Sequence, residues 1–297
     1  MTLELDLNPT ASLIEIPNPS GDGLEQTRMI PARTWGNAQD CIAGALLVHG
    51  LGAHSGWFEA CGRQLKERRI FALSYDQVGF GKRRQEKFLG PEQWYGDLVT
   101  SFGYLQNVLG KKPIYVMGNS MGAAVALKVI GDSRVQPRGF IMFSPGFDGH
   151  PQTFTLGYRL GAITQALLHP NDEITLPYTV AMVTGTQSIR TYISCDPDRR
   201  FEPTGRMLLG VLKLSIALKR IAAVSCPIFL FSAGIDRIVD VKLGLKTYQR
   251  LKAPSKQQSH FPEAWHDLMF DPALEEVCKE IADWIASTAN LQAETQG

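Results

Sequence analysis

Five short apolar runs mark the chain, and stretches with helical spacing separate most of them. Apolar runs this short, bounded by polar segments, are typical of strands that are buried on both faces. Strands that alternate with helices predict an α/β fold, in which a mostly parallel central sheet has helices on both faces. The five predicted strands are residues 45–48, 70–75, 113–117, 139–143 and 227–232.

Amphipathic helices are predicted between the strands. In residues 55–69, Phe58 and Leu65 fall on one helical face. Pro91 suits the first turn of a second helix, because a proline there loses no intrahelical hydrogen bond. Helices of this kind would cover the two faces of the sheet.

The alternation breaks between residues 145 and 224, where two long helical stripes replace it. This interval leaves the edge of the sheet at which α/β proteins build their ligand sites. We therefore expect a single α/β domain over residues 1–297, with an approximate helical cap insertion over residues 145–224. The first stripe contains Leu156, Leu160, Ile163 and Leu167, and the second contains Met207, Val211, Leu214, Leu218 and Ile221.

The segment GNSMG, residues 118–122, places a serine between two glycines where a predicted strand meets a predicted helix. Glycine on both sides suits a bend that is too tight for larger side chains. G-x-S-x-G at a strand-to-helix turn is the nucleophile elbow of α/β-hydrolases, which exposes a serine hydroxyl above the sheet. Ser120 is therefore the candidate nucleophile, and the single predicted domain is expected to have the α/β-hydrolase fold. The competing interpretation is a serine that only caps the following helix.

A nucleophilic serine needs a base to accept its proton and an acid to orient that base. In α/β-hydrolases the acid and then the histidine follow the serine in chain order. His266 precedes a predicted helix and is preferred as the base over His260, which lies in a polar stretch after the last predicted strand. Asp236 follows that strand and a small-residue turn, so it is the preferred acid, whereas Asp240 suits a helix N-cap.

Backbone N–H groups are expected to stabilise the oxyanion of the tetrahedral intermediate. One would come from Met121, directly after the nucleophile. The other would come from Leu51, in the loop after the first predicted strand. His49 in the same loop is expected to order the loop rather than to react.

Composition and charge argue against several other classes of function. The net charge of +1 and the lack of a long basic stripe give no indication of nucleic-acid binding. Five scattered cysteines without a C-x-x-C pair suggest neither a zinc site nor a disulfide framework. The first residues lack a signal-peptide pattern, and no apolar run is long enough to cross a membrane. We expect a cytoplasmic protein that uses neither a metal nor an organic cofactor.

Five motifs, taken in order, resemble those of monoacylglycerol lipases and their lysophospholipase-like relatives of the serine aminopeptidase type. They are HGLGAHSGWF, YDQVGFGK, GNSMGAAVAL, SAGIDRIVD and WHDLMFD, and they span roughly residues 43–285. The resemblance implies a catalytic triad and an oxyanion hole on the same residues that the chain order favours. The implied triad is Ser120, Asp236 and His266, and the implied oxyanion hole is Leu51 and Met121.

Other segments are similar to this family or depart from it. SCDPD, residues 194–198, is similar to the Asp-Pro segment that follows the cap in the family. Asn119 stands where the lipase pattern usually has histidine. The segment GNSMG also resembles the elbow of hydrolases that cleave carbon–carbon bonds.

These observations predict a serine hydrolase that cleaves carboxylic esters through an acyl-enzyme. The expected substrates are single-chain acyl esters such as monoacylglycerols or lysolipids, which the apolar cap suits. The first cap stripe allows a peripheral membrane contact, although a buried face would explain it equally well. The alternatives are a carbon–carbon-bond hydrolase or a thioesterase of the same fold, and a non-catalytic binding protein.

Overall fold

The computed structural model of the protein describes residues 5, 7–18 and 28–290. Within these residues an eight-stranded sheet has the order β1-β2-β4-β3-β5-β6-β7-β8. The neighbours of β2 are antiparallel to it, and the pairs from β4 to β8 are parallel. The strands are β1 (Ser12–Asn18), β2 (Arg28–Trp35), β3 (Ala43–Val48), β4 (Ile70–Tyr75), β5 (Ile114–Asn119), β6 (Gly139–Phe143), β7 (Ile228–Ile235) and β8 (Lys256–Trp265).

The five predicted strands are confirmed as β3, β4, β5, β6 and β7, each within three residues of its predicted ends. Three strands toward the two edges of the sheet, β1, β2 and β8, were not predicted from the sequence. Much of β8 is exposed, so its sequence lacks a continuous apolar run. His260 lies within β8. The expectation that His260 follows the last strand is therefore wrong.

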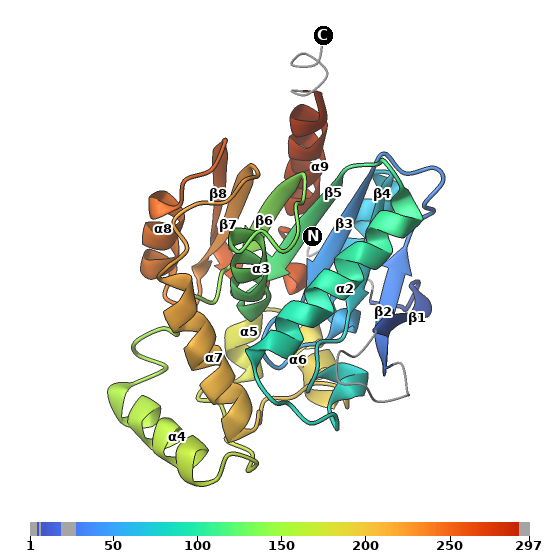
Figure 1. The fold of residues 1–297 in the computed structure, drawn as a ribbon. Helices are drawn as coiled ribbons and strands as arrows, with labels where there is room; N and C mark the ends of the chain where they lie inside the picture. Colours follow the sequence, from blue (N-terminus) through green and yellow to red (C-terminus); the bar gives the residue numbers. More distant parts are fainter. Residues whose placement is uncertain (1–4, 6, 19–27, 291–297) are drawn as a thin grey trace.

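Helices cover both faces of the sheet, as predicted (Figure 1). One face packs against α1 (Glu59–Glu67) and α9 (Leu274–Asn290). The other packs against α2 (Pro91–Leu109), α3 (Met121–Gly131) and α8 (Val241–Arg250). Pro91 occupies the first turn of α2, which confirms that prediction. Short 3₁₀ helices span Ser55–Phe58, Gly81–Arg83 and Leu268–Phe270.

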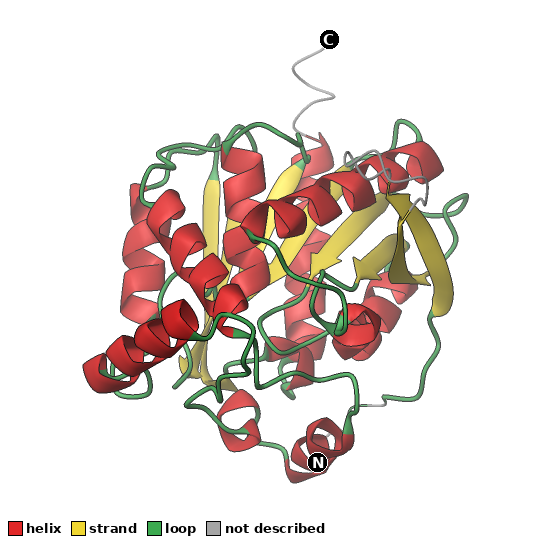
Figure 2. Ribbon diagram, turned by 60° about the horizontal axis from the view of Figure 1, so that its bottom comes forward, coloured by secondary structure: helices red, strands yellow, loops and turns green. Residues whose placement is uncertain are grey.

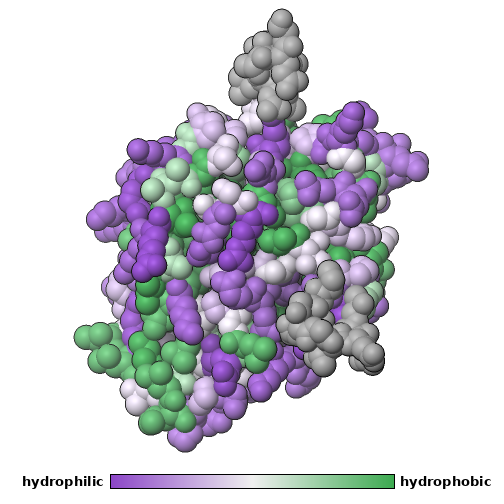
Figure 3. All heavy atoms as spheres, viewed as in Figure 1, coloured by the Kyte–Doolittle hydropathy of each residue, from purple (hydrophilic) through white to green (hydrophobic). Residues whose placement is uncertain are grey.

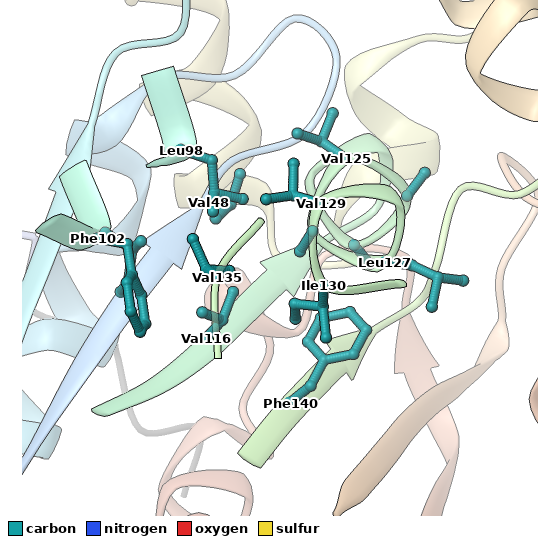
Figure 4. Packing of buried hydrophobic residues seen from close by; sticks show 14 of the residues in the cluster. Val48, Leu98, Phe102, Val116, Val125, Leu127, Val129, Ile130, Val135 and Phe140 are labelled. Atoms are coloured by element: carbon teal, nitrogen blue, oxygen red, sulfur yellow. The ribbon is translucent and has the colours of Figure 1, made fainter. Parts of the chain in front are cut away.

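The central strands send alternate side chains into two separate cores. In β5, Val116 joins the core beneath α2 and α3, while Tyr115 and Met117 join the core beneath α1 and α9. Figure 4 shows Val48 and Val116 of the strands facing side chains of the helices, among them Val129. Burial on both faces explains why these strands are continuous apolar runs in the sequence.

The interval between β6 and β7 holds α4 (Leu156–Leu168), α5 (Val180–Val183), α6 (Gln187–Cys195) and α7 (Gly205–Leu218). The helix α7 packs against α2, α3 and α4, so it joins this interval to the main helical layer. Figures 1 and 2 show α4 away from the sheet, beyond α7. No helix in the described part of the chain is long and apolar enough to span a membrane.

The N-terminus of α3 lies very close to the end of β3, and Gly122 makes this approach possible. A Cβ atom at Gly122 would clash with the backbone carbonyl of Val48. At Gly161, within α4, such a Cβ would meet no atom of the described chain within 4 Å outside its own stretch of helix. The two glycines therefore offer a matched pair of substitutions.

We expect Gly122→Ala to lower the free energy of unfolding by about 3 kcal/mol, because the added methyl group meets backbone that cannot move aside. Gly161→Ala should instead raise it, by up to about 1 kcal/mol, because alanine favours the helix. Urea unfolding followed by circular dichroism measures both changes. Equal effects of the two substitutions would contradict the close approach of α3 to β3.

Candidate active site

Ser120 joins β5 to α3 with a strained backbone conformation, φ +53° and ψ −119°. A non-glycine residue held there costs about 1–3 kcal/mol, which the surroundings must offset. The Ser120 N–H donates to the Phe143 carbonyl at 2.9 Å, and its carbonyl accepts from the Gly146 N–H at 2.9 Å. The hydroxyl makes no capping hydrogen bond to α3. The conformation is therefore that of an elbow, and the interpretation as a simple N-cap is not supported.

His266 and Asp236 meet although 30 residues separate them. Each directly follows a strand, β8 or β7, and these strands are parallel neighbours in the sheet. His266 Nδ1 lies 2.7 Å from Asp236 Oδ2. The other carboxylate oxygen accepts the N–H groups of Ile238 and Val239, at 2.8 and 3.0 Å. These two bonds fix the carboxylate so that one oxygen faces the imidazole.

This pairing determines which nitrogen of His266 can act as a base. A carboxylate only accepts hydrogen bonds, so Nδ1 carries the proton and Nε2 keeps a free lone pair. Burial lowers the pKa of His266, but the charge and hydrogen bond of Asp236, together with the charge of Asp267, outweigh burial and raise that pKa above its usual 6.5. The arrangement suits a histidine that gains and returns a proton near neutral pH.

The two residues that the sequence analysis ranked second have other surroundings. Asp240 accepts the Leu243 N–H at 2.9 Å and caps α8, as predicted. His260 is exposed on β8, and its Nδ1 lies 3.0 Å from Ser232 Oγ. Neither residue lines the cavity that contains Ser120.

One cavity of about 390 Å³ brings the predicted site residues together. Ser120 and His266 line it, and so do Leu51 and Met121, the two residues predicted to supply oxyanion N–H groups. Met121 is the first residue of α3, where helical N–H groups have no intrahelical acceptor. Asp236 lies behind His266, outside the lining. Most of the remaining wall is aliphatic or aromatic.

His49 shapes the loop that carries Leu51, as predicted. Its Nε2 accepts the Gln77 N–H at 3.1 Å, so Nδ1 donates to the Gly50 carbonyl at 2.9 Å. Complete burial lowers the pKa of His49 to about 4. The imidazole is therefore neutral and fixed at neutral pH.

A buried network links this loop to the segment after α6. Asp196 Oδ2 lies 2.8 Å from both His54 Nε2 and Trp57 Nε1. Burial favours the neutral acid, but the hydrogen bond and charge of His54 outweigh it and lower the pKa of Asp196 to about 2. The motifs HGLGAHSGWF and SCDPD thus contact each other, which their separate positions in the sequence did not indicate.

Asp267 and Asn119 also line the cavity, and neither was predicted from the sequence as a site residue. Burial raises the pKa of the Asp267 carboxyl to about 6, although the neighbouring His266 partly opposes this. The Asp267 N–H donates to the Val183 carbonyl at 3.1 Å and so connects the histidine loop to α5. In the sequence, the only indication that these two residues belong to the site is that they directly neighbour Ser120 and His266.

Within the described residues, no group of three or more histidine, cysteine, aspartate or glutamate side chains could hold a metal ion.

We expect Asp236→Asn to lower the pKa of His266 below its usual 6.5, because burial persists while the opposing negative charge is lost. Histidine NMR titration of both proteins measures this shift. His49 is an internal reference that should titrate near pH 4 in each protein. An unchanged or higher pKa of His266 would show that the carboxylate is not its partner in solution.

This chain is similar to known proteins in sequence and in fold. A family model described as serine aminopeptidase, S33, matches residues 41–273. Human "Monoglyceride lipase" is 23% identical over 226 residues, which cover 74% of this chain and 74% of that protein.

Solved structures share the fold. A soluble variant of monoglyceride lipase from Saccharomyces cerevisiae, in complex with a substrate analog, has a TM-score of 0.80 at 18% identity. The alignment covers 95% of this chain and 97% of that chain. The monoacylglycerol lipase of Paleococcus ferrophilus has a TM-score of 0.74 at 19% identity, with coverage of 87% and 99%. At these identities the structural likeness shows the fold, which is that of the α/β-hydrolases.

Proposed function

Because this chain belongs to the α/β-hydrolase family described as serine aminopeptidase, S33, we propose that it cleaves carboxylic esters through an acyl-enzyme on Ser120. One observation supports ester hydrolysis more strongly than the alternative functions. A strained serine and a carboxylate-oriented histidine line the same largely apolar cavity. The protein is a serine ester hydrolase of the lipase and esterase type.

In the proposed mechanism, His266 Nε2 accepts the proton of Ser120 as the hydroxyl oxygen attacks the ester carbonyl. The N–H groups of Leu51 and Met121 donate to the oxyanion, and losing one such donor costs about 3–4 kcal/mol of barrier in related systems. The imidazolium then protonates the leaving alcohol, and water hydrolyses the acyl-enzyme by the same steps. Asp236 stabilises the imidazolium throughout.

Single-chain acyl esters such as monoacylglycerols or lysolipids are the proposed substrates. The walls contributed by Leu176, Val183, Phe201 and Val211 suit an aliphatic acyl chain. The names of the relatives from human, Saccharomyces cerevisiae and Paleococcus ferrophilus, all monoglyceride or monoacylglycerol lipases, support the same class. The chemistry requires no organic cofactor.

We propose that the chain is one domain in which residues 145–224 form a cap over the nucleophile. Residues of α4 and α7 line the cavity that contains Ser120, which supports this assignment. The five cysteines are free, as is typical of a reducing compartment, so we propose a cytoplasmic location.

The cap also offers a surface for a peripheral membrane contact. Exposed fractions are 72% for Leu156, 58% for Leu160 and 65% for Leu167. These are three of the four residues in the predicted stripe, so a buried face does not explain them. Figure 3 shows hydrophobic side chains gathered over α4, at the lower left of the view. An exposed apolar patch of this kind marks an interaction surface, and a lipid surface would supply the proposed substrate.

The proposed function predicts how hydrolysis depends on acyl chain length. Rates for esters from acetyl to palmitoyl should rise toward long chains, because each added methylene buries apolar surface in the cavity. Ser120→Ala should remove all activity and remain folded, and it is the blank for the assay. A peak at acetyl would make the protein a small-ester hydrolase. Activity only on thioesters, or only on substrates with a scissile carbon–carbon bond, would contradict ester hydrolysis and make the protein a thioesterase or a carbon–carbon-bond hydrolase.

Paired variants test the assignment of the acid in the same assay. Asp236→Asn should lower kcat about 10⁴-fold, because the imidazole loses its tautomer and its stabilising charge. Asp240→Asn retains a capping side chain and should leave kcat within about twofold. A greater loss of kcat in Asp240→Asn than in Asp236→Asn would make Asp240, and not Asp236, the acid that orients His266.

The membrane contact predicts weaker lipid binding when the exposed leucines of α4 become polar. We expect Leu160→Ser and Leu167→Ser each to lower partitioning onto phosphatidylcholine vesicles about 10-fold, because each loses about 1.5 kcal/mol of apolar burial. Co-sedimentation measures the bound fraction. Leu89→Ser is the control, because Leu89 is 58% exposed and lies outside the cap. Equal losses in the control and cap variants would rule out a specific contact through α4.

A further inference from the structure

We propose that Asp148 recognises free hydroxyl groups on the alcohol portion of the substrate. The inference rests on the proposed ester hydrolysis and deepens it by naming a residue for alcohol specificity. Through this contact, Asp148 favours acyl esters of a polyol, such as a 1-acylglycerol, over simple alkyl esters of the same acid. Asp148 lines the cavity that contains Ser120 and His266.

The loop that carries Asp148 is held directly against the nucleophile. The Gly146 N–H donates to the Ser120 carbonyl, and Asp148 is two residues further along the chain. Two residues span at most about 7 Å between Cα atoms, so Asp148 lies near the reacting ester. Its carbonyl accepts the Asp240 N–H at 3.0 Å. These bonds at both ends give the loop a defined position.

The Asp148 carboxylate has one occupied oxygen and one available oxygen. Oδ1 accepts the Gly149 N–H at 2.8 Å and Arg159 Nη1 at 2.6 Å. Arg159 is itself fixed, because Nε donates to the Phe154 carbonyl at 2.7 Å and Nη2 donates to the Gly149 carbonyl at 2.8 Å. Oδ2 accepts no hydrogen bond from the part of the chain that the structure describes, and the side chain is 40% exposed. A fixed, accessible carboxylate oxygen is an acceptor for a hydroxyl group.

Most other polar side chains of the cavity wall already form hydrogen bonds within the protein. Tyr158 donates to the Thr175 carbonyl, Tyr178 to the Leu51 carbonyl, and Ser215 to the Phe147 carbonyl. Asn119 Oδ1 has no hydrogen-bond partner among the described residues, but this oxygen is buried and solvent does not reach it. Asp267 also lines the cavity, but its side chain is buried and its Oδ1 accepts the Met269 N–H. Asp148 Oδ2 is therefore the exposed carboxylate oxygen of the wall that a substrate hydroxyl can reach.

A donor lines the same cavity. Lys219 has no ion-pair partner among the described side chains and lies at the C-terminal end of α7. A polyol hydroxyl can donate to a carboxylate and accept from an ammonium group at once. An alkyl ester has no hydroxyl to offer and would leave both charged groups without a substrate partner.

The test compares two decanoyl esters, 1-decanoylglycerol and methyl decanoate, hydrolysed by the wild type and by Asp148→Asn. The asparagine retains an oxygen for the Gly149 and Arg159 bonds and replaces the free oxygen by an NH₂ group. We expect kcat/KM to fall about 10-fold or more for the glycerol ester, since a hydrogen bond to a charged group is lost. For the methyl ester it should stay within about twofold. Asp172→Asn, on an exposed cap aspartate outside the lining, should change neither rate.

Equal losses on both esters, or no loss on either, would overturn the role of Asp148 and leave ester hydrolysis standing. A wild type that hydrolyses neither ester would overturn the proposed function and this inference with it. A second measurement needs no variant: 1-O-decylglycerol and decyl methyl ether compete with a chromogenic ester on the wild type. The diol should bind about 10-fold more tightly. Equal inhibition would also overturn the inference.

Discussion

The close approach of α3 to the ends of β3 and β5 is the constraint on which the site depends. Gly122 has no side chain to hold the helix away from the Val48 carbonyl. The approach leaves no room for a relaxed junction, so Ser120 takes a positive φ. Its N–H donates to the Phe143 carbonyl at the end of β6, and its carbonyl accepts the N–H of Gly146 in the loop that follows. The stability of two full cores on either side of the sheet offsets this local strain.

The other parts of the site are placed relative to this elbow by parallel strands. The strands β7 and β8 end side by side, which brings Asp236 to His266 without any long connecting loop. Backbone N–H groups fix the carboxylate, the carboxylate fixes the imidazole tautomer, and the imidazole faces the cavity of the serine. Each group in this series restricts the next, so the proposed catalytic groups need little rearrangement before they react.

The proposed cap is joined to the rest of the domain by polar contacts as well as by apolar packing. Asp196 holds His54 and Trp57 beside the proposed oxyanion loop, and Arg159 holds α4 to the loop of Asp148. These contacts leave the outer face of α4 apolar and exposed. The same insertion thereby supplies the cavity wall, the proposed alcohol site and the proposed membrane surface.

Local patterns in the sequence were sufficient to predict the central strands, the elbow at Ser120, the N-cap at Asp240 and the preference for Asp236 and His266. Each of these depends on neighbouring residues or on chain order, and the structure brings the preferred pair to 2.7 Å. Tertiary structure decided what local patterns do not encode. It made a strand of the polar segment around His260, joined Asp196 to His54, and left one oxygen of Asp148 open to the cavity. The physical reason is that edge strands and buried polar contacts are stabilised by partners far away in the chain, so their own residues need carry no periodic signal.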